Sequence, residues 1–216
     1  LYIQADDGIR GFGLSRGLGD VCRGQEYHTA PGARFEMGTV DIRGVPTRVW
    51  KNAPANLRQV AMVGRAHGER LFAIYEDERV TYDAWFRAVA QLAGELRARG
   101  VEKGDRVALA MRNLPEWPVA FFAATTIGAI CVPLNAWWTG PELAFGLANS
   151  GAKLLVCDAE RWDRIAPHRA ELPDRPTVLV SRCDAAVPYP HLTLPTTHSA
   201  LCPAVSAPLH KASSPH

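Results

Sequence analysis

The sequence lacks most of the short motifs that identify nucleotide-binding and metal-dependent enzymes. Its 216 residues contain no GxxxxGKS/T loop, no HExxH pair and no CxxC pair. Two glycine-rich segments, residues 11–13 and 17–19, miss the spacing of a dinucleotide-binding loop and precede no predicted helix. These absences exclude a Walker-type phosphate loop, a zincin-type metal site and a thioredoxin-like redox site as explanations of function.

Strong charge and clustered cysteine are also absent. The formal net charge is +2 and no dense Lys/Arg run occurs, so we expect no nucleic-acid partner. The five cysteines are scattered, an odd set that fits a reducing cytoplasm better than a disulfide framework. No charged-then-apolar leader opens the sequence. With 47% hydrophobic and 21% charged residues the composition is that of a globular protein, and we expect it in the cytoplasm.

One long central stretch has no charge, because no charged residue follows Glu116 until Glu142. Such a stretch must be buried, either in a membrane or in a protein core. About 20 apolar residues would span a bilayer, so residues 117–134 could form a transmembrane segment. Gly128 and Pro133 interrupt the run, which favours burial in a protein core. We therefore expect no transmembrane segment.

The same stretch can be divided into a helix and a strand. Asn113 offers a helix cap, Pro115 suits the first turn, and Glu116 stands three residues after the cap as in a capping box. Gly128 supplies a left-handed stop for a helix that ends near residue 127. The short β-rich run at residues 130–133 is typical of a buried parallel strand.

Strands and helices alternate through the rest of the chain. Strands are predicted at residues 106–111, 130–133, 153–157 and 176–180. Helices are predicted at residues 82–99, 114–127, 140–150 and 159–169. Their N-caps are Thr81, Asn113, Thr139 and Asp158. The strands recur about every 24 residues, so the fold class is α/β, with a mainly parallel sheet and helices on both faces.

The segment before residue 82 gives weaker signals. Residues 35–51 mix short apolar runs with glycine and proline, and we expect an irregular lead-in. A helix is predicted to open at residues 52–54 and to end near Gly64. Residues 71–75 and 79–82 are predicted to form a β-hairpin around the acidic turn at residues 76–78. These acids could be a metal or acid–base site, but a solvated, unpaired hairpin tip is favoured.

Both ends differ from the middle of the chain. Residues 1–25 show no helical or strand period and resemble translated adaptor sequence, and residues 188–216 are rich in Pro, Ser, Thr and His. We expect both segments to be non-native or disordered, which leaves residues 26–187 as the folded part. The tail histidines have no metal-ligand spacing, so we assign no metal site to them.

Ligands of open parallel sheets bind beyond the carboxyl ends of the strands. The residues predicted there are Arg112, Asn113, Asn135, Asp158, Ser181 and Arg182. Asn113 and Asp158 are equally explained as helix caps, and Asn135 as a turn residue.

Two tryptophans follow the predicted strand at residues 130–133. Trp137 and Trp138 could line an apolar ligand pocket, or they could cover the edge of the sheet. Together with Asn113 and Asn135 they are the candidate ligand-proximal residues, and we assign no catalytic, cofactor-binding or metal-binding residue.

An ordered series of short motifs resembles the amino-terminal part of the AMP-forming acyl-CoA synthetases, which belong to the adenylate-forming superfamily. The series comprises Val80-Thr81-Tyr82, Gly104-Asp105-Arg106-Val107-Ala108, Asn113-Leu114-Pro115-Glu116-Trp117, Val132-Pro133-Leu134-Asn135 and Ser150-Gly151-Ala152-Lys153-Leu154. The resemblance is dense from residue 81 to residue 158 and thinner from residue 44 to residue 180.

The resemblance implies a ligase of fatty acid metabolism that uses ATP, Mg²⁺ and coenzyme A, with a fatty acid or another carboxylic acid as substrate. In this family a Ser/Thr/Gly-rich loop ending in Pro-Lys-Gly holds the phosphates, and a carboxy-terminal domain carries a catalytic Lys. The sequence contains no such loop after residue 180. We therefore expect a fragment of an acyl-CoA synthetase that is inactive alone. The alternative is a standalone βα module that binds a ligand without catalysis.

Overall fold

A computed structural model describes residues 27–173, 176–182 and 191–192 of the chain. The chain divides into two compact units, Leu1–Ala55 and Asn56–His216, and each is described by itself. The expected leader, residues 1–25, lies outside the described residues, as does most of the expected tail.

The described part of the first unit is built around an antiparallel hairpin. Strand β1 (Met37–Ile42) pairs with strand β2 (Val45–Trp50). The expectation of an irregular lead-in at residues 35–51 is therefore wrong. The turn explains why: Arg43 and Gly44 both have positive φ, 56° and 83°, as a two-residue hairpin turn requires. Arg-Gly is not one of the strong sequence signals for this turn.

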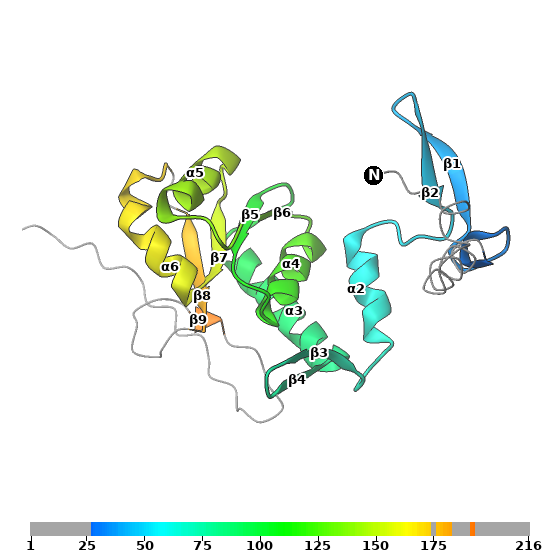
Figure 1. Cartoon of the computed structure of the whole chain (residues 1–216), viewed down its shortest axis with the longest axis horizontal. Coiled ribbons are helices and arrows are strands. Elements are labelled where there is room, and N and C mark those ends of the chain that lie inside the picture. Colours follow the sequence, from blue (N-terminus) through cyan, green and yellow to red (C-terminus); the bar gives the residue numbers. More distant parts are fainter. Residues whose placement is uncertain (1–26, 174–175, 183–190, 193–216) are drawn as a thin grey trace, which may run out of the picture. The chain divides into compact units, whose positions relative to one another are not determined.

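The second unit contains a five-stranded sheet with the order β6-β5-β7-β8-β9, in which every pairing is parallel (Figure 1). Its strands are β5 (Arg106–Ala110), β6 (Ile130–Pro133), β7 (Leu154–Asp158), β8 (Thr177–Ser181) and β9 (His191–Leu192). The predicted parallel sheet is confirmed. Strand β9 adds a fifth strand within the segment 188–216, which was expected to have no ordered elements.

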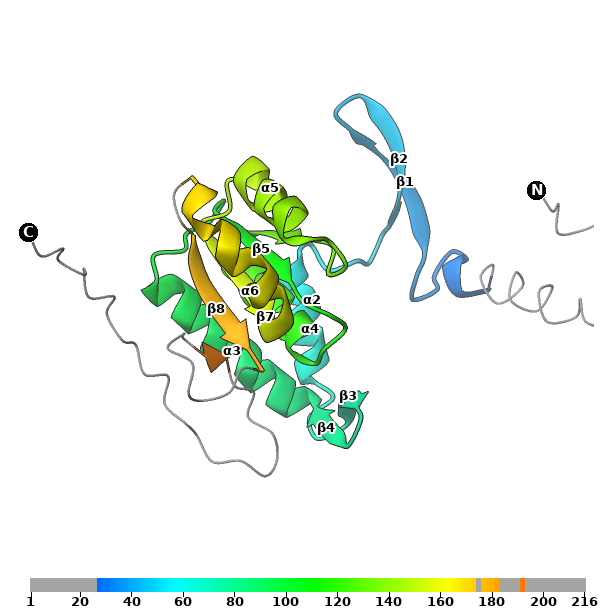
Figure 2. The same ribbon diagram turned by 60° about the vertical axis from the view of Figure 1, so that its left-hand side comes forward.

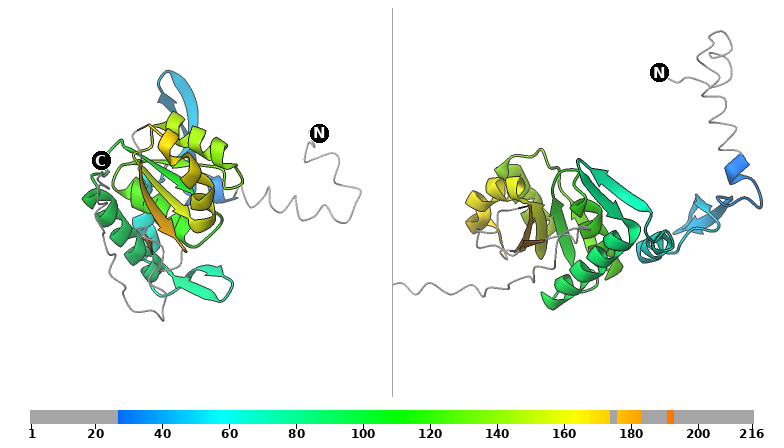
Figure 3. Two further views of the ribbon diagram at one scale, coloured as in Figure 1. Left: turned by 90° about the vertical axis from the view of Figure 1, so that its left-hand side faces the viewer. Right: turned by 90° about the horizontal axis from the view of Figure 1, so that it is seen from below.

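Helices cover both faces of this sheet, as predicted (Figure 2). They are α3 (Tyr82–Ala98), α4 (Glu116–Thr126), α5 (Gly140–Ser150) and α6 (Ala159–Ile165), which continues as the 3₁₀ helix η1 (Ala166–Glu171). Helix α2 (Leu57–Arg65) packs against α3 and α4. Side chains alternate across β5: Val107 and Leu109 face α3 and α4, whereas Ala108 and Ala110 face α5 and α6. Figure 3 shows the same arrangement from two further directions.

The uncharged stretch folds into the predicted helix and strand. Helix α4 ends at Thr126, Gly128 takes a positive φ of 86°, and β6 follows, so the alternative of a membrane span over residues 117–134 is wrong. In the part of the chain that the structure describes, no helix has the length and apolarity needed to cross a bilayer. The helical part of the stretch is apolar because α4 packs against the sheet and α3.

The predicted start of α4 is wrong in its details. The N-cap is Pro115, with no side-chain cap hydrogen bond, and Asn113 is exposed. The proposed capping-box residue Glu116 is instead only 5% exposed. Helix α2 also starts later than predicted, because Asn56 caps it by accepting a hydrogen bond from the Gln59 N–H.

The predicted hairpin β3 (Leu71–Tyr75) and β4 (Glu78–Thr81) is confirmed. Thr81 ends β4 and caps α3 by accepting a hydrogen bond from the Ala84 N–H at 3.2 Å. Trp85, Leu92 and Leu96 are buried on the predicted face of α3. The hairpin is therefore continuous with one of the two helices that cover this face of the sheet.

Candidate functional site

The carboxyl-terminal edge of the parallel sheet contains a topological switch point. The chain leaves β5 through α4 to reach β6 on one side, and leaves β7 through α6 to reach β8 on the other. Because α4 and α6 lie on opposite faces, the segments after β5 and β7 diverge. In open α/β sheets a crevice at such a point is the usual place for a ligand.

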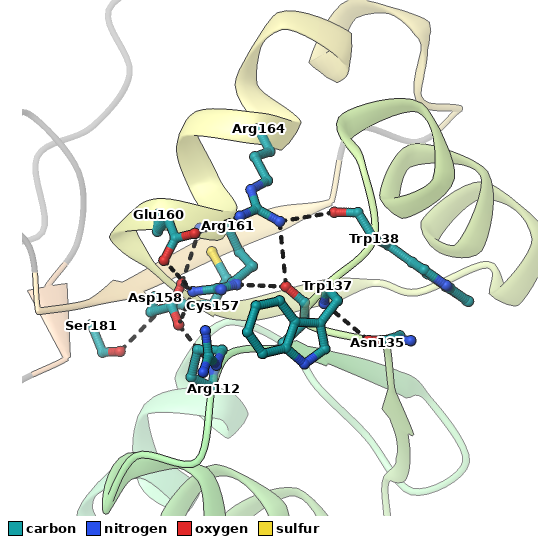
Figure 4. Close-up of polar contacts among 11 residues, drawn as sticks. Arg112, Asn135, Trp137, Trp138, Cys157, Asp158, Glu160, Arg161, Arg164 and Ser181 are labelled. Carbon is teal, nitrogen blue, oxygen red and sulfur yellow. Dashed lines mark hydrogen bonds and ion pairs between the residues drawn. The ribbon is translucent and has the colours of Figure 1, made fainter.

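Asp158, the last residue of β7, forms hydrogen bonds with the segments that meet at this edge (Figure 4). Its carboxylate accepts a hydrogen bond from the Arg112 backbone N–H at 3.0 Å, across the switch point. It also accepts from the Arg161 backbone N–H at 2.9 Å, which confirms its role as the N-cap of α6. The same carboxylate pairs with the Arg161 guanidinium at 3.0 Å.

Arg161 is buried, with 1% of its surface exposed. Its Nη1 donates to Asp158 and to Glu160, and its Nε donates to the Ala136 carbonyl at 2.9 Å. Nη2 is buried without a hydrogen-bond partner in the described structure. A buried guanidinium needs a paired carboxylate, so Asp158 and Arg161 stabilise each other only as a pair. The sequence analysis did not single out Arg161.

The segment between β6 and α5 is held against α6 by side chains of that helix. Arg164 donates to the Trp138 carbonyl at 3.1 Å, in addition to the bond from Arg161 to Ala136. Asn135 accepts a hydrogen bond from the Trp137 N–H at 2.9 Å, which confirms its predicted role in a turn. This segment thus has a fixed backbone.

The two candidate tryptophans have different environments. Trp138 packs beside Leu134 against the core that lies under α5, and a Cβ at Gly146 would lie 3.0 Å from its ring. Trp137 is 68% exposed, and the Arg112 guanidinium carbon lies 3.8 Å from the centre of its ring. Of the pair, Trp138 packs against the core and Trp137 is exposed to solvent.

A second charged group lies at the end of β8. Arg182, with a positive φ of 53°, donates to both carboxylate oxygens of Glu78, at 2.7 and 3.0 Å. Its Nε also pairs with Glu116 at 2.9 Å. These bonds, chiefly those to Glu78, raise the pKa of Arg182 above its usual range. The expectation that the acids of the hairpin turn are unpaired is wrong for Glu78.

Ser181 lies between these two groups and is fully buried. Its hydroxyl donates to the Cys157 carbonyl of the neighbouring strand at 3.4 Å. The candidates Arg112, Asn135, Trp137 and Asp158 are therefore grouped near the switch point, whereas Ser181 points into the sheet. Asn113 is exposed, and its side chain makes none of the hydrogen bonds or ion pairs described above for this group.

The site does not have the composition of a metal centre. Across residues 27–173 and 176–182, no three side chains of His, Cys, Asp or Glu are grouped so that they could hold a metal ion. The two acids nearest the switch point, Asp158 and Glu160, are both paired with arginines. No reaction step through Mg²⁺ is therefore derived from these residues.

Comparison with known proteins places the chain in a family. The family model described as AMP-binding enzyme matches residues 59–211. The chain belongs to this family. The match starts within α2 and continues past residue 187, the end of the folded part expected from the sequence.

Two relatives of this AMP-binding chain are named as a coenzyme A ligase and a CoA thioester synthase. A long-chain-fatty-acid–CoA ligase of Mycobacterium tuberculosis is 38% identical over 124 residues, 56% of this chain and 24% of the relative. A feruloyl-CoA synthase of an Amycolatopsis species is 44% identical over 87 residues, 40% of this chain and 18% of the relative. The resemblance to the AMP-forming acyl-CoA synthetases is confirmed.

A solved structure supports the same assignment. A fatty acyl-CoA synthetase of Mycobacterium tuberculosis matches with a TM-score of 0.53 at 32% identity, over 58% of this chain and 26% of that chain. The AMP-binding chain thus spans between 18% and 26% of the length of these three relatives. The α/β fold with a parallel sheet is the fold of this part of the family.

Proposed function

We propose that this AMP-binding chain is an amino-terminal portion of an AMP-forming acid–thiol ligase. The observation that carries the proposal is the family match over residues 59–211, supported by the parallel sheet. The relatives are named for acids as different as a long-chain fatty acid and the feruloyl group. The proposal therefore names a carboxylic acid as substrate and does not select one acid.

The proposed reaction has two steps and uses ATP, Mg²⁺ and coenzyme A. A carboxylate oxygen attacks the α-phosphorus of ATP, and pyrophosphate leaves as the acyl-adenylate forms. The thiolate of coenzyme A then attacks the acyl carbonyl, and AMP leaves as the thioester forms. Both steps need donors or cations that stabilise charge on the reacting groups.

The described residues supply a framework for this chemistry. Asp158 and Arg161 hold together the segments at the switch point, and Arg182 joins the hairpin β3–β4 to the end of β8. No Ser/Thr/Gly-rich loop ending in Pro-Lys-Gly is encoded after β8 in the 216 residues. We propose that this chain alone does not catalyse adenylation, and that residues 26–187 together with strand β9 form its folded part.

A cytoplasmic location belongs to the same proposal. Cys131 is a free thiol, and burial raises its pKa to about 11. A free, protonated thiol at this position in the sheet behaves as a small apolar side chain and suits a reducing compartment.

The test is acid-dependent release of pyrophosphate from MgATP. It compares the 216-residue chain with the product of a longer reading frame that contains it, using long-chain fatty acids and ferulate as separate substrates. We expect release and CoA thioester from the longer product and neither from the chain. Release by the chain would overturn its proposed inactivity, and a longer product inactive on every acid would overturn the ligase proposal.

A further inference from the structure

One face of the hairpin β1–β2, here called the aliphatic face, has no charged residue. Cross-strand partners share a face, so the strand register places six residues on this one: Gly38, Val40, Ile42, Val45, Thr47 and Val49. Val40, Ile42 and Val45 are 45%, 47% and 61% exposed, so no other layer of residues 27–55 buries them. A two-stranded hairpin is only marginally stable alone in water, and we therefore expect the aliphatic face to have a partner.

The unit that bears this face is basic. Residues 27–55 contain four cations and two acids: Arg34, Arg43, Arg48, Lys51, Glu36 and Asp41. Glu36 forms an ion pair with Lys51 at 2.5 Å, and Asp41 accepts a hydrogen bond from the Gly44 N–H at 2.8 Å. No ion pair joins the three arginines to an acid within the described residues. With His28 neutral, four cations and two acids leave a net charge of +2 on residues 27–55.

We propose that the aliphatic face, with Arg43 at its turn, binds the surface of a bilayer that contains anionic lipid. Ile42 and Val45 flank the turn, so a cation lies beside two exposed aliphatic side chains. Such side chains enter the boundary between headgroups and acyl chains, and a guanidinium donates hydrogen bonds to lipid phosphates. This attachment is made from the surface and involves no membrane-spanning segment.

The hairpin lies outside the part of the chain that matches the family. The family match begins at residue 59, whereas β2 ends at Trp50 in the first unit. Membership of the family therefore does not explain the aliphatic face. Lipid binding by this face neither requires nor implies the proposed ligase reaction.

Charge and area favour a lipid surface over a second copy of the chain. Two copies joined through the aliphatic face would bring two basic units together, and like charges oppose such a pairing. Three half-exposed aliphatic side chains also offer far less than the roughly 800 Å² per partner that a stable protein interface buries. A bilayer needs less apolar area, because the attraction of basic residues to anionic lipid adds to the burial of side chains.

The turn holds Arg43 in a defined position. Both turn residues have positive φ, and the Asp41 carboxylate accepts from the Gly44 N–H. A backbone that is already fixed lowers the entropy lost when the cation binds. The same geometry selects a variant that keeps the hairpin, because asparagine adopts positive φ more readily than arginine and Asn-Gly is a preferred two-residue turn. Arg43→Asn thus removes the charge and preserves the turn.

The experiment measures vesicle binding by the whole 216-residue chain. The vesicles contain phosphatidylcholine alone or equal parts of phosphatidylcholine and phosphatidylglycerol, and cosedimentation gives the partition constant. The test variants are Arg43→Asn and the double variant Ile42→Thr with Val45→Thr, in which threonine keeps the strand propensity. The matched controls are Arg87→Gln and Val63→Thr, which remove an exposed cation of α3 and an exposed aliphatic side chain of α2. Sedimentation velocity gives the oligomeric state of each chain.

We expect wild type to bind the anionic vesicles more tightly than those of phosphatidylcholine alone, and added salt to weaken that binding. Arg43→Asn should weaken it about fivefold, the usual effect of one basic residue near an anionic surface. The double threonine variant should weaken it about tenfold, because less apolar surface is removed from water. The two control variants should bind as wild type does.

Three results would overturn the lipid site. The first is equal binding, or none, to the two vesicle compositions. The second is binding by the hairpin variants as tight as by the two controls, which would place the lipid contact elsewhere on the chain. The third is a wild-type dimer that the double threonine variant dissociates while vesicle binding stays unchanged, which would assign the aliphatic face to a second copy of the chain.

Discussion

Asp158 connects three segments through a single carboxylate. It accepts from the backbone after β5, caps α6 and neutralises the buried Arg161. The first of these contacts joins residues 46 positions apart in the sequence, and the other two lie within one helical turn. Loss of this one side chain therefore affects both sides of the switch point.

The first prediction concerns this carboxylate. Asp158→Ala leaves Arg161 buried without its main counter-ion, and removing one partner of a buried pair typically costs about 3–5 kcal/mol. We expect a loss of this size in the free energy of unfolding, measured by urea denaturation. The control Asp163→Ala changes an exposed acid of the same helix and should have little effect. Equal losses in the two variants would contradict the role of the pair.

At the scale of secondary-structure elements, Arg182 links the end of β8 to two other elements. It joins the end of β8 to the hairpin β3–β4 through Glu78 and to the start of α4 through Glu116. Glu116 is 5% exposed, and its second carboxylate oxygen has no partner in the described structure. Arg182 is therefore the recorded counter-charge of a buried acid.

The second prediction follows from that burial. Arg182→Gln should destabilise the chain by roughly 1–3 kcal/mol, because Glu116 loses its charged partner. Adding Glu116→Gln should restore part of the loss, since the unpaired charge is then gone. Urea denaturation of the single and double variants measures both effects, with the exposed Arg79→Gln as control. A double variant with the full sum of the single losses would contradict the pairing.

The third prediction is a pH dependence at the start of α5. Thr139 donates to Glu142 from its backbone N–H and its hydroxyl, chiefly the former, and this lowers the pKa of Glu142 below its usual 4.5. A lowered folded pKa means that the contribution to stability is complete above the unfolded pKa and is lost as pH falls through the folded value.

Glu142→Gln keeps an acceptor but cannot ionise. We expect the variant to be less stable than wild type at neutral pH, and the difference to vanish below the lowered pKa. Thermal midpoints across this range measure the difference. A difference that stays constant down to the acid limit would show that the carboxylate charge contributes nothing to the cap.

The elements that were predicted correctly are those with local signals. The capping box of Thr139 and Glu142 starts α5 and the left-handed Gly151 ends it, and Thr81 caps the start of α3. The β1–β2 hairpin was missed because its Arg43-Gly44 turn is a weak local signal, whereas the burial of Glu116 was missed because it depends on a distant partner. Glu116 has the sequence position of a capping-box residue. In the folded chain it is buried and forms an ion pair with Arg182, which follows β8.

The candidate site was predictable in outline only. Parallel strands place their following residues on one edge, so Arg112, Asn135 and Asp158 could be grouped from the sequence. The pairing of Asp158 with Arg161 across one turn could have been inferred from the i,i+3 spacing. The stacking of Arg112 on Trp137 could not, because it depends on the path of the segment between β6 and α5.

The fourth prediction concerns the whole molecule and orders the strands by how strongly their backbone amides are protected from hydrogen exchange. Strands β5 and β7 are each paired on both sides, whereas β6 stands at one end of the strand order. Amides of β5 and β7 should therefore exchange with deuterium most slowly, and half of the β6 amides much faster. Exchange followed by mass spectrometry or NMR measures this order. Uniform exchange across the three strands would contradict the described pairing.

The order of the strands has a consequence for synthesis. Strand β5 emerges from the ribosome first and can be joined on one side by β6, but its other side waits for β7. At about 5–20 residues per second, the stretch from Pro133 to Asp158 takes about 1–5 s to make. During that interval the free side of β5 exposes a row of unpaired backbone N–H and C=O groups, with which another polypeptide can pair. A chaperone that binds the nascent chain in this window would keep these groups from pairing with another polypeptide.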